Sequence, residues 1–247
     1  MDTFFGKEFP GPPFELFGQQ HLVALTILAL SILFLVWLRY QKNSRVKAAV
    51  AMGIAGILLV DEVLYHLWNL HIGEWTVQKM LPLQLCTVFV WLSPFLLWRK
   101  HYRIYEFAYF VGIGGALQAV LTPDIAEYSF PHFRFFQVFL SHSCIILAAL
   151  YMTLVERFRP TLRSLGRVLV GLNLYMVLVF GINILLGSNY LYLMHKPETP
   201  SALDMMGPWP WYIVASEALA IFIFFLLYLP FGLYDVRQRW KPKIAKA

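Results

Sequence analysis

Charged residues and cysteines are scarce in this sequence. Asp, Glu, Lys and Arg make up 14% of its 247 residues, whereas a soluble domain carries about a quarter. This shortage excludes an ordinary soluble protein, because its surface would lack the polar side chains that face water. The two cysteines, Cys86 and Cys144, are too few for a disulfide scaffold, and their spacing fits no metal site. A single disulfide bridge between them is compatible with the sequence.

The first twenty residues lack the pattern of a cleavable signal peptide. They carry Asp2, Glu8 and Glu15 against Lys7, are rich in Pro and Gly, and contain no short apolar core behind a basic start. We therefore expect residues 1–20 to form an extracytoplasmic segment, and the apolar run that follows them to stay in the membrane.

Long apolar runs are what the sequence has in abundance. Hydrophobic residues make up 59% of the chain, and the mean hydropathy is +0.61. Runs of about 18 or more such residues can cross roughly 30 Å of hydrocarbon as a helix. No alternating β-barrel pattern is present, and backbone groups in lipid must pair within the chain. The sequence therefore predicts an all-α, polytopic membrane bundle of about seven transmembrane helices within residues 21–233, with runs at 21–38, 48–68, 81–98, 105–121, 133–155, 168–186 and 211–229.

The distribution of positive charge predicts the orientation of this bundle. Most of the 20 Lys and Arg residues lie after the first, third, fifth and seventh runs, which is one side of the membrane if there are seven spans. The positive-inside rule places that side in the cytoplasm, so we expect the N-terminus outside and a basic cytoplasmic tail at 234–247. Short basic clusters beside membrane spans are what topology requires, so we expect no nucleic-acid partner. The oligomeric state is left open.

Polar side chains within the runs mark the candidate site, because they are costly in lipid. A single such residue usually bonds a neighbouring helix. In the predicted topology, however, they gather in the outer half of the spans, and the cytoplasmic half is almost purely apolar. This common depth favours a site formed by Asp61, Glu62, His66, Gln84, Cys86, Gln118, Gln137, His142, Asn183 and Glu217, with Asn189 just beyond its run. Glu62 and His66 are four residues apart and so share a helix face.

Cys86 is the candidate nucleophile, although a buried cysteine is more often a small hydrophobe. Pro82 is typical of the first turn of a helix, which would place Cys86 near a helix N-terminus, where a thiolate is favoured. At 1.5 Å per residue, His142 lies at a matching depth and is a candidate base for the thiol. Cys144 is on nearly the opposite face of the helix that carries His142, and we expect it to pack.

Several segments resemble a known family. Residues 81–86 read Leu-Pro-Leu-Gln-Leu-Cys, which resembles the Leu-Pro-Leu-His-Leu-Cys signature of the bacterial YwaF-like membrane proteins. The segments 121–124, 141–142, 189–193, 196–197 and 207–212 match the other blocks of that family. The resemblance covers nearly the whole chain and departs at Gln84, where many relatives carry His. It implies an integral protein of the bacterial plasma membrane.

The YwaF-like family is distantly similar to the eukaryotic transmembrane-protein-164 acyltransferases. These move fatty acyl chains between phospholipids through a cysteine nucleophile and a histidine. The similarity implies those two roles for Cys86 and His142, with membrane phospholipids or lysolipids as substrates.

The leading hypothesis is therefore a membrane-embedded lipid acyltransferase that passes the acyl chain through a thioester. Gln84, Gln118 or Asn183 would donate hydrogen bonds to the oxyanion, and the pair Glu62–His66 would orient the site. A lipid hydrolase, with water as the acceptor, is the alternative of the same class. A transporter or lipid-binding protein that holds a ligand without chemistry is the alternative from another class.

We expect neither a cofactor nor a metal centre. His66, His142 and Glu62 are chemically suitable ligands, but they lack the dense spacing of a metal site.

Overall fold

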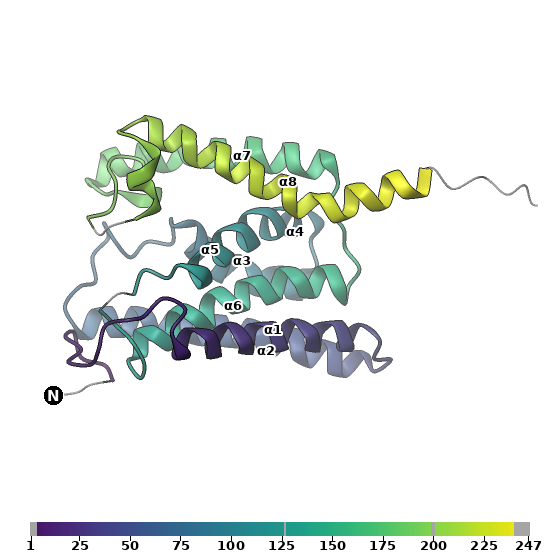
Figure 1. The fold of residues 1–247 in the computed structure, drawn as a ribbon, viewed down its shortest axis with the longest axis horizontal. Coiled ribbons are helices and arrows are strands. Elements are labelled where there is room, and N and C mark those ends of the chain that lie inside the picture. Colours follow the sequence, from purple (N-terminus) through teal and green to yellow (C-terminus); the bar gives the residue numbers. More distant parts are fainter. Residues whose placement is uncertain (1–3, 126, 199–200, 240–247) are drawn as a thin grey trace, which may run out of the picture.

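The computed structural model describes residues 4–125, 127–198 and 201–239, and every regular element in these ranges is helical. The predicted all-α bundle is confirmed. In chain order (Figure 1) the elements are α1 (Gln19–Arg39), α2 (Ser44–His71), α3 (Leu85–Arg99), α4 (Tyr102–Phe107), the π-helical turn η1 (Ala108–Gly112), α5 (Ile113–Leu121), α6 (Phe133–Leu154), α7 (Leu162–Leu186), the 3-10 turns η2 (Tyr190–Tyr192) and η3 (Ala202–Met206), and α8 (Trp211–Arg239).

Six helical segments in the described residues are long and apolar enough to cross a membrane, with α4, η1 and α5 counted together as Tyr102–Leu121. The remaining predicted span, third in chain order, is α3, which is apolar but has only 15 residues, or about 22 Å of helix. The protein is thus an integral membrane protein whose spans match the apolar runs, apart from their ends.

The predicted start of the third span at residue 81 is wrong. α3 begins at Leu85, and Gln84 before it has an extended backbone, so Pro82 precedes the helix and is not part of its first turn. Tertiary hydrogen bonds explain the difference. The backbone N–H of Leu81 donates to the Tyr190 hydroxyl at 2.9 Å, and the Tyr175 hydroxyl donates to the Leu83 carbonyl at 2.9 Å. In a helix that began at residue 81, the Leu83 carbonyl would accept from the Thr87 N–H, so the Tyr175 hydroxyl takes an acceptor that such a helix needs. The Tyr190 hydroxyl holds the segment before α3 at Leu81.

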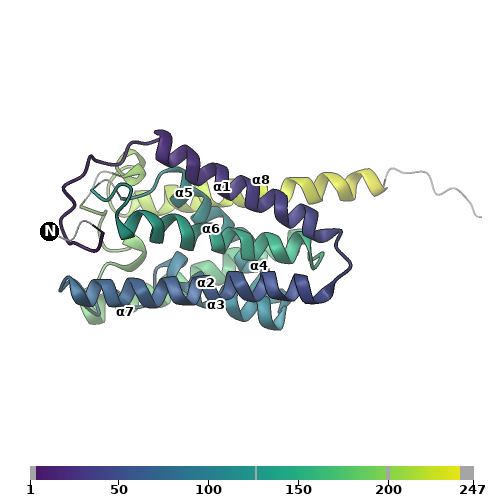
Figure 2. The ribbon, with the colours of Figure 1, turned by 90° about the horizontal axis from the view of Figure 1, so that it is seen from below.

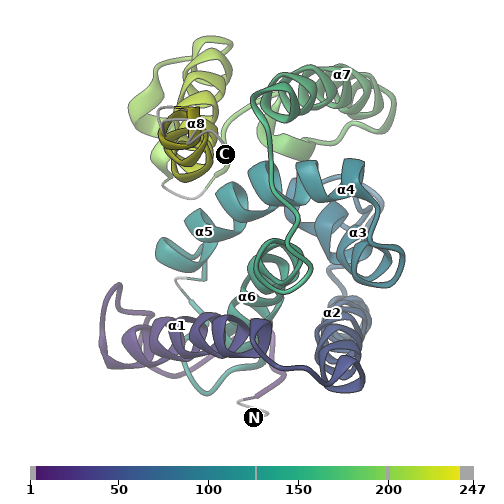
Figure 3. The ribbon, with the colours of Figure 1, turned by 90° about the vertical axis from the view of Figure 1, so that its right-hand side faces the viewer.

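Helix α6 forms the centre of the bundle. It lies between α1 and α2 (Figure 2) and also packs against α3 and α5. α7 and α8 lie together on one side of the molecule, beyond α4 and α5, and α1 and α2 lie on the opposite side (Figure 3). The core is therefore built around α6, and α7 and α8 form an outer pair.

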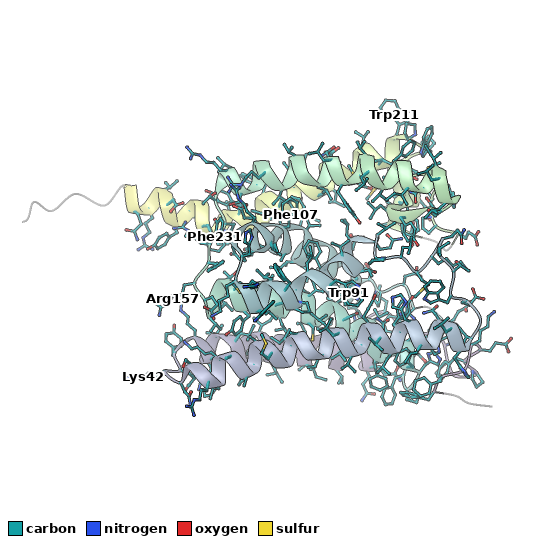
Figure 4. All side chains as sticks on the ribbon, turned by 180° about the vertical axis from the view of Figure 1, so that it is seen from behind. Lys42, Trp91, Phe107, Arg157, Trp211 and Phe231 are labelled. Carbon is teal, nitrogen blue, oxygen red and sulfur yellow. The ribbon has the colours of Figure 1, made fainter. Side chains whose placement is uncertain are left out.

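The two ends of the bundle differ in character. Lys42 and Arg157 lie at one end and Trp211 at the other (Figure 4). We call the first, where α2, α4 and α7 begin, the basic end. α8 projects beyond it (Figure 1) as far as Arg239. The part of the expected tail at 234–239 is therefore helical, and the remainder, 240–247, lies outside the described residues.

We call the opposite end the capped end, because segment 4–18 lies across it. The Trp68 indole donates to the Phe5 carbonyl at 2.9 Å, and the Tyr128 hydroxyl donates to the Lys7 carbonyl at 2.8 Å. These bonds fix the expected N-terminal segment onto the end of α2 and onto the connection between α5 and α6.

An ion pair also ties this segment to the connection after α2. Lys7 Nζ lies 2.7 Å from Glu74 Oε1, and Lys79 Nζ lies 3.1 Å from Glu74 Oε2. Hydrogen bonds from Lys7 and, to a lesser extent, from Lys79 lower the pKa of the Glu74 carboxyl. The carboxylate that bridges the two segments is thereby kept ionised.

Gly112 lies where three helices meet. A methyl group in place of its Hα would lie 3.4 Å from Cγ2 of Ile145 on α6 and 3.5 Å from Cγ of Phe89 on α3. Gly112 also ends η1, whose five residues are all buried. π-Helical turns are rare in proteins overall, but those that occur are often at functional sites. The small residue allows α3, α5 and α6 to approach closely here.

Replacing Gly112 by leucine is expected to lower the stability of the folded bundle by about 1–3 kcal/mol, because the added atoms would overpack this junction. Gly56→Leu is the matched control, since no atom lies within 4 Å of a methyl at that exposed position on α2. Thermal unfolding in detergent, followed by tryptophan fluorescence, should show a lower midpoint for Gly112→Leu alone. Equal midpoints would contradict the close packing of the junction.

Candidate active site

Cys86 on α3, Gly115 on α5 and His142 on α6 occupy positions in one layer of the bundle. At the Gly112 junction, Phe89 and Ile145 face the last residue of η1, directly before α5. Cys86 precedes Phe89 by three residues, Gly115 follows Gly112 by three, and His142 precedes Ile145 by three. Each step moves about 4.5 Å toward the capped end and stays near the same helix face.

A direct contact supports this layer. The Sγ atom of Cys86 lies 3.9 Å from the place of a methyl on Gly115, so the thiol faces the bare backbone of α5. Cys86 is half-buried and Cys144 is buried, and both thiols are free. The disulfide bridge that the sequence allowed is absent from the structure.

The N-terminus of α3 holds unpaired backbone donors beside the thiol. Cys86 is the second residue of α3, and the Gln84 side chain does not cap the helix. Within the described residues, the N–H groups of Leu85, Cys86 and Thr87 donate no hydrogen bond, whereas the N–H of Val88 bonds the Gln84 carbonyl at 2.9 Å. Free N–H groups at a helix N-terminus attract negative charge. These donors are not evident in the sequence, because Pro82 and the apolar run suggest a helix that begins four residues earlier, at residue 81.

The hydrogen bond of His142 sets the proton arrangement of its ring. Nδ1 lies 2.7 Å from the Val138 carbonyl oxygen. Because a carbonyl only accepts, Nδ1 must carry a proton, and in the neutral ring Nε2 then has a free lone pair. Nε2 makes no hydrogen bond in the part of the chain that the structure describes. This is the arrangement that a general base needs.

Gln84 and Gln118, two predicted oxyanion donors, retain free amide N–H groups. Gln84 Oε1 accepts from the Leu191 N–H at 3.1 Å, and its NH₂ group donates no bond within the described residues. Gln118 follows Gly115 by one turn of α5, and its exposed side chain makes no hydrogen bond there either. Both amides lie at or beyond the layer of Cys86, toward the capped end.

Asn183 and Asn189 instead hold loop backbone. Asn183 donates to the Tyr190 carbonyl at 2.9 Å and accepts from the Tyr190 N–H at 2.8 Å. Asn189 accepts from the Met194 N–H at 3.0 Å and donates to the His195 carbonyl at 2.8 Å. Asn183 thereby positions Tyr190, which in turn holds the segment before α3.

Glu62 and His66 form the hydrogen bond that their spacing predicts. His66 Nε2 lies 3.3 Å from Glu62 Oε1, and the Trp75 indole donates to His66 Nδ1 at 2.9 Å. Because an indole N–H only donates, Nδ1 is unprotonated, so Nε2 carries the proton that Glu62 accepts. Neither side chain bonds Cys86 or His142, and the described residues contain no group of three or more potential metal-ligating His, Cys, Asp or Glu side chains.

Two further networks link helices elsewhere. Asn173 on α7, which the sequence analysis missed, donates to Glu217 on α8 at 2.6 Å. Gln137 on α6 donates to Asp61 on α2 at 3.1 Å and accepts from Arg134. The polar residues expected at one depth therefore divide into separate networks, of which only part surrounds Cys86.

The expectation that the half of the spans near the basic end is almost purely apolar is wrong. Glu106 on α4 is fully buried there and pairs with Arg167 on α7. The signal in the sequence was Arg103, three residues before Glu106 and close enough to pair with it on a helix.

Comparison with protein families matches residues 16–228 to the TMEM164 family. No curated protein and no solved structure matches the chain. The family match confirms the resemblance to transmembrane protein 164, and it includes Cys86 and His142. The narrower resemblance to YwaF-like proteins stays a prediction.

Tyr190→Phe is expected to loosen the start of α3, because the hydroxyl donates to the Val77 carbonyl at 2.6 Å and accepts from Leu81. Hydrogen exchange at the Leu81 amide should become faster in this variant. The control is Tyr192→Phe, whose hydroxyl makes no hydrogen bond within the described residues. Unchanged exchange in Tyr190→Phe would show that this hydroxyl does not hold the segment.

Proposed function

We propose that this chain, which belongs to the TMEM164 family, is a membrane-embedded phospholipid acyltransferase with Cys86 as nucleophile and His142 as base. The observation that carries the proposal is the Cys86 thiol, which lies beside free backbone N–H groups and faces Gly115. The resemblance to the transmembrane-protein-164 acyltransferases supplies the reaction class.

The first half-reaction forms an acyl-enzyme. His142 Nε2 takes the thiol proton as Cys86 Sγ attacks the carbonyl carbon of a phospholipid ester. The carbon–oxygen bond of the ester then breaks, and His142 returns the proton to the leaving lysophospholipid oxygen. The acyl chain is left on Cys86 as a thioester.

The second half-reaction reverses these steps with another acceptor. A lysolipid hydroxyl attacks the thioester carbonyl while His142 takes its proton. The carbon–sulfur bond breaks, and the proton returns to Cys86. The net result is one ester bond broken and one formed, so no cofactor is consumed.

The developing oxyanion is stabilised by the N-terminus of α3. The unpaired N–H groups of Cys86 and Thr87 are suited to this task, because they are already oriented before the charge appears. The free amides of Gln84 and Gln118 are additional donors. The bare backbone of Gly115 leaves room for the acyl carbonyl beside Sγ.

The expected orientation assigns this chemistry to one leaflet. With the basic end in the cytoplasm, as the positive-inside rule requires, the layer of Cys86 lies in the outer leaflet, and the expected membrane is the bacterial plasma membrane. Donor and acceptor lipids would then enter from that leaflet.

Cys86→Ala is expected to abolish acyl-thioester formation, because the variant has no nucleophile. The purified protein in nanodiscs is incubated with phosphatidylcholine labelled in its acyl chains, and protein-bound label that hydroxylamine releases is counted. Cys144→Ala is the control and should keep the label, since that thiol packs in the core. Full labelling of Cys86→Ala would refute the mechanism.

The same assay separates the alternatives. Label that appears as free fatty acid rather than in a second lipid indicates a hydrolase. A transporter or lipid-binding protein would leave neither Cys86 nor any product labelled.

His142→Gln should slow thioester formation by about 10²–10⁴-fold, the usual contribution of a general base. His71→Gln, at the exposed end of α2, is the matched control and should react at the wild-type rate. Single-turnover rates with the same labelled lipid measure both. Wild-type rates in His142→Gln would exclude this histidine as the base.

A further inference from the structure

A second polar site lies near the basic end, at the opposite end of the bundle from the layer of Cys86. The fully buried carboxylate of Glu106 accepts from Ser164 Oγ at 2.6 Å and from Arg167 Nε at 3.1 Å. Arg167 Nη2 also bonds it, and Arg103 Nη1 lies 3.5 Å away. One carboxylate is thus shared by two guanidinium groups, which leaves an excess of one positive charge.

These two arginines have donors to spare. Arg167 uses Nε and Nη2 on Glu106, so Nη1 has no partner within the described residues. Arg103 approaches Glu106 with Nη1 alone, and 59% of its side chain is exposed. Planar guanidinium groups with free N–H bonds are well suited to bind a phosphate through two parallel hydrogen bonds.

The arginines lie at one end of an open groove between α4 and α7, of about 560 Å³. Its walls beyond them are apolar and include Phe107, which Figure 4 labels, and Val170 and Leu174. Grooves and pockets of roughly 300–1,000 Å³ are the usual size for small-molecule ligands. A second hollow shares Val170 and Leu174 and continues along α7 to Val177.

The length of this surface along α7 is about half the thickness of the hydrocarbon core of a bilayer. Ten residues separate Arg167 from Val177, which is about 15 Å along the helix, and a hydrocarbon core is roughly 30 Å thick. Val170, Leu174 and Val177 are 62%, 67% and 73% exposed. The surface therefore offers positive charge at the depth of the headgroups and apolar side chains as far as the middle of the membrane.

We propose that this groove binds an anionic glycerophospholipid, with its phosphate on Arg103 and Arg167 and one acyl chain along α7 as far as Val177. The excess positive charge selects an anionic headgroup, and the apolar wall selects a lipid over a soluble anion. The bound lipid fills the space between α4 and α7. It serves as a structural lipid at the opposite end of the bundle from Cys86, so it is independent of the acyl-transfer chemistry.

Gly166 supplies a way to block the groove without disturbing the fold. It lines the groove, and no atom lies within 4 Å of a methyl at this position. A leucine there would project into the space that the lipid occupies. Gly181, farther along α7, has equally open surroundings outside the groove and provides the matched control.

The test uses the full-length protein released from detergent micelles in native mass spectrometry, titrated with dioleoyl-phosphatidylglycerol or dioleoyl-phosphatidylcholine. The wild type should bind the anionic lipid with about tenfold higher apparent affinity. Arg103→Gln should remove most of that preference, because it removes the excess positive charge. The variant should still fold, since Glu106 keeps Arg167 and Ser164 as partners. Arg163→Gln, an exposed arginine of α7 outside the groove, should keep it.

Gly166→Leu should likewise lose binding of phosphatidylglycerol, and Gly181→Leu should retain it. Equal binding of the two lipids by the wild type, or an unchanged preference in Arg103→Gln, would overturn the proposal. Displacement of phosphatidylglycerol by millimolar inorganic phosphate would identify a soluble anion as the ligand and would also overturn it. If Gly166→Leu does not fold, Arg103→Gln and its Arg163→Gln control decide the question.

Discussion

Hydrocarbon offers no hydrogen-bond partner to a polar group, and this constraint explains most of the side-chain contacts inside the bundle. Asn183 uses its amide on the backbone of Tyr190, and Asn173 joins α7 to the carboxylate of Glu217 on α8. Among the described residues, Ser93 Oγ is the one buried side-chain nitrogen or oxygen atom without a partner. Polar side chains within the spans therefore act mainly as cross-links between helices and loops.

The backbone N–H groups at the start of α3 lack acceptors within the described residues, as they do at the uncapped starts of α1 and α4. At α3, however, they lie beside the free thiol of Cys86. Unpaired donors away from water cost free energy unless a ligand accepts their hydrogen bonds. The carbonyl oxygen of a lipid ester is such an acceptor. The groove at the basic end also presents free donors, the guanidinium N–H groups of Arg103 and Arg167, beside an apolar wall. This combination suits the anionic, amphiphilic ligand that we propose for it.

The candidate site was predictable only where the relation between residues is local. Glu62 and His66 lie one helical turn apart, so their hydrogen bond followed from their spacing. Gln137 and Asp61 are 76 residues apart, and neither segment contains a pattern that indicates the other as its hydrogen-bond partner. The shared depth of the polar residues predicts a site in that half of the bundle. It could not separate those that surround Cys86 from those that hold a loop, because depth does not specify which helix faces which.

The sequence by itself determined the number of spans, their approximate ends and the basic end of the bundle, since the length and charge of each run act locally against lipid and water. Tertiary structure alone decided where α3 begins, because the hydroxyls that hold residues 81–83 come from Tyr175 and Tyr190, 92 and 109 residues away from the groups they bind. It also decided the neighbours of Cys86. A glycine can serve a turn, a kink or a close contact, and only the packed helices show that Gly112 and Gly115 bring α3, α5 and α6 together around the thiol.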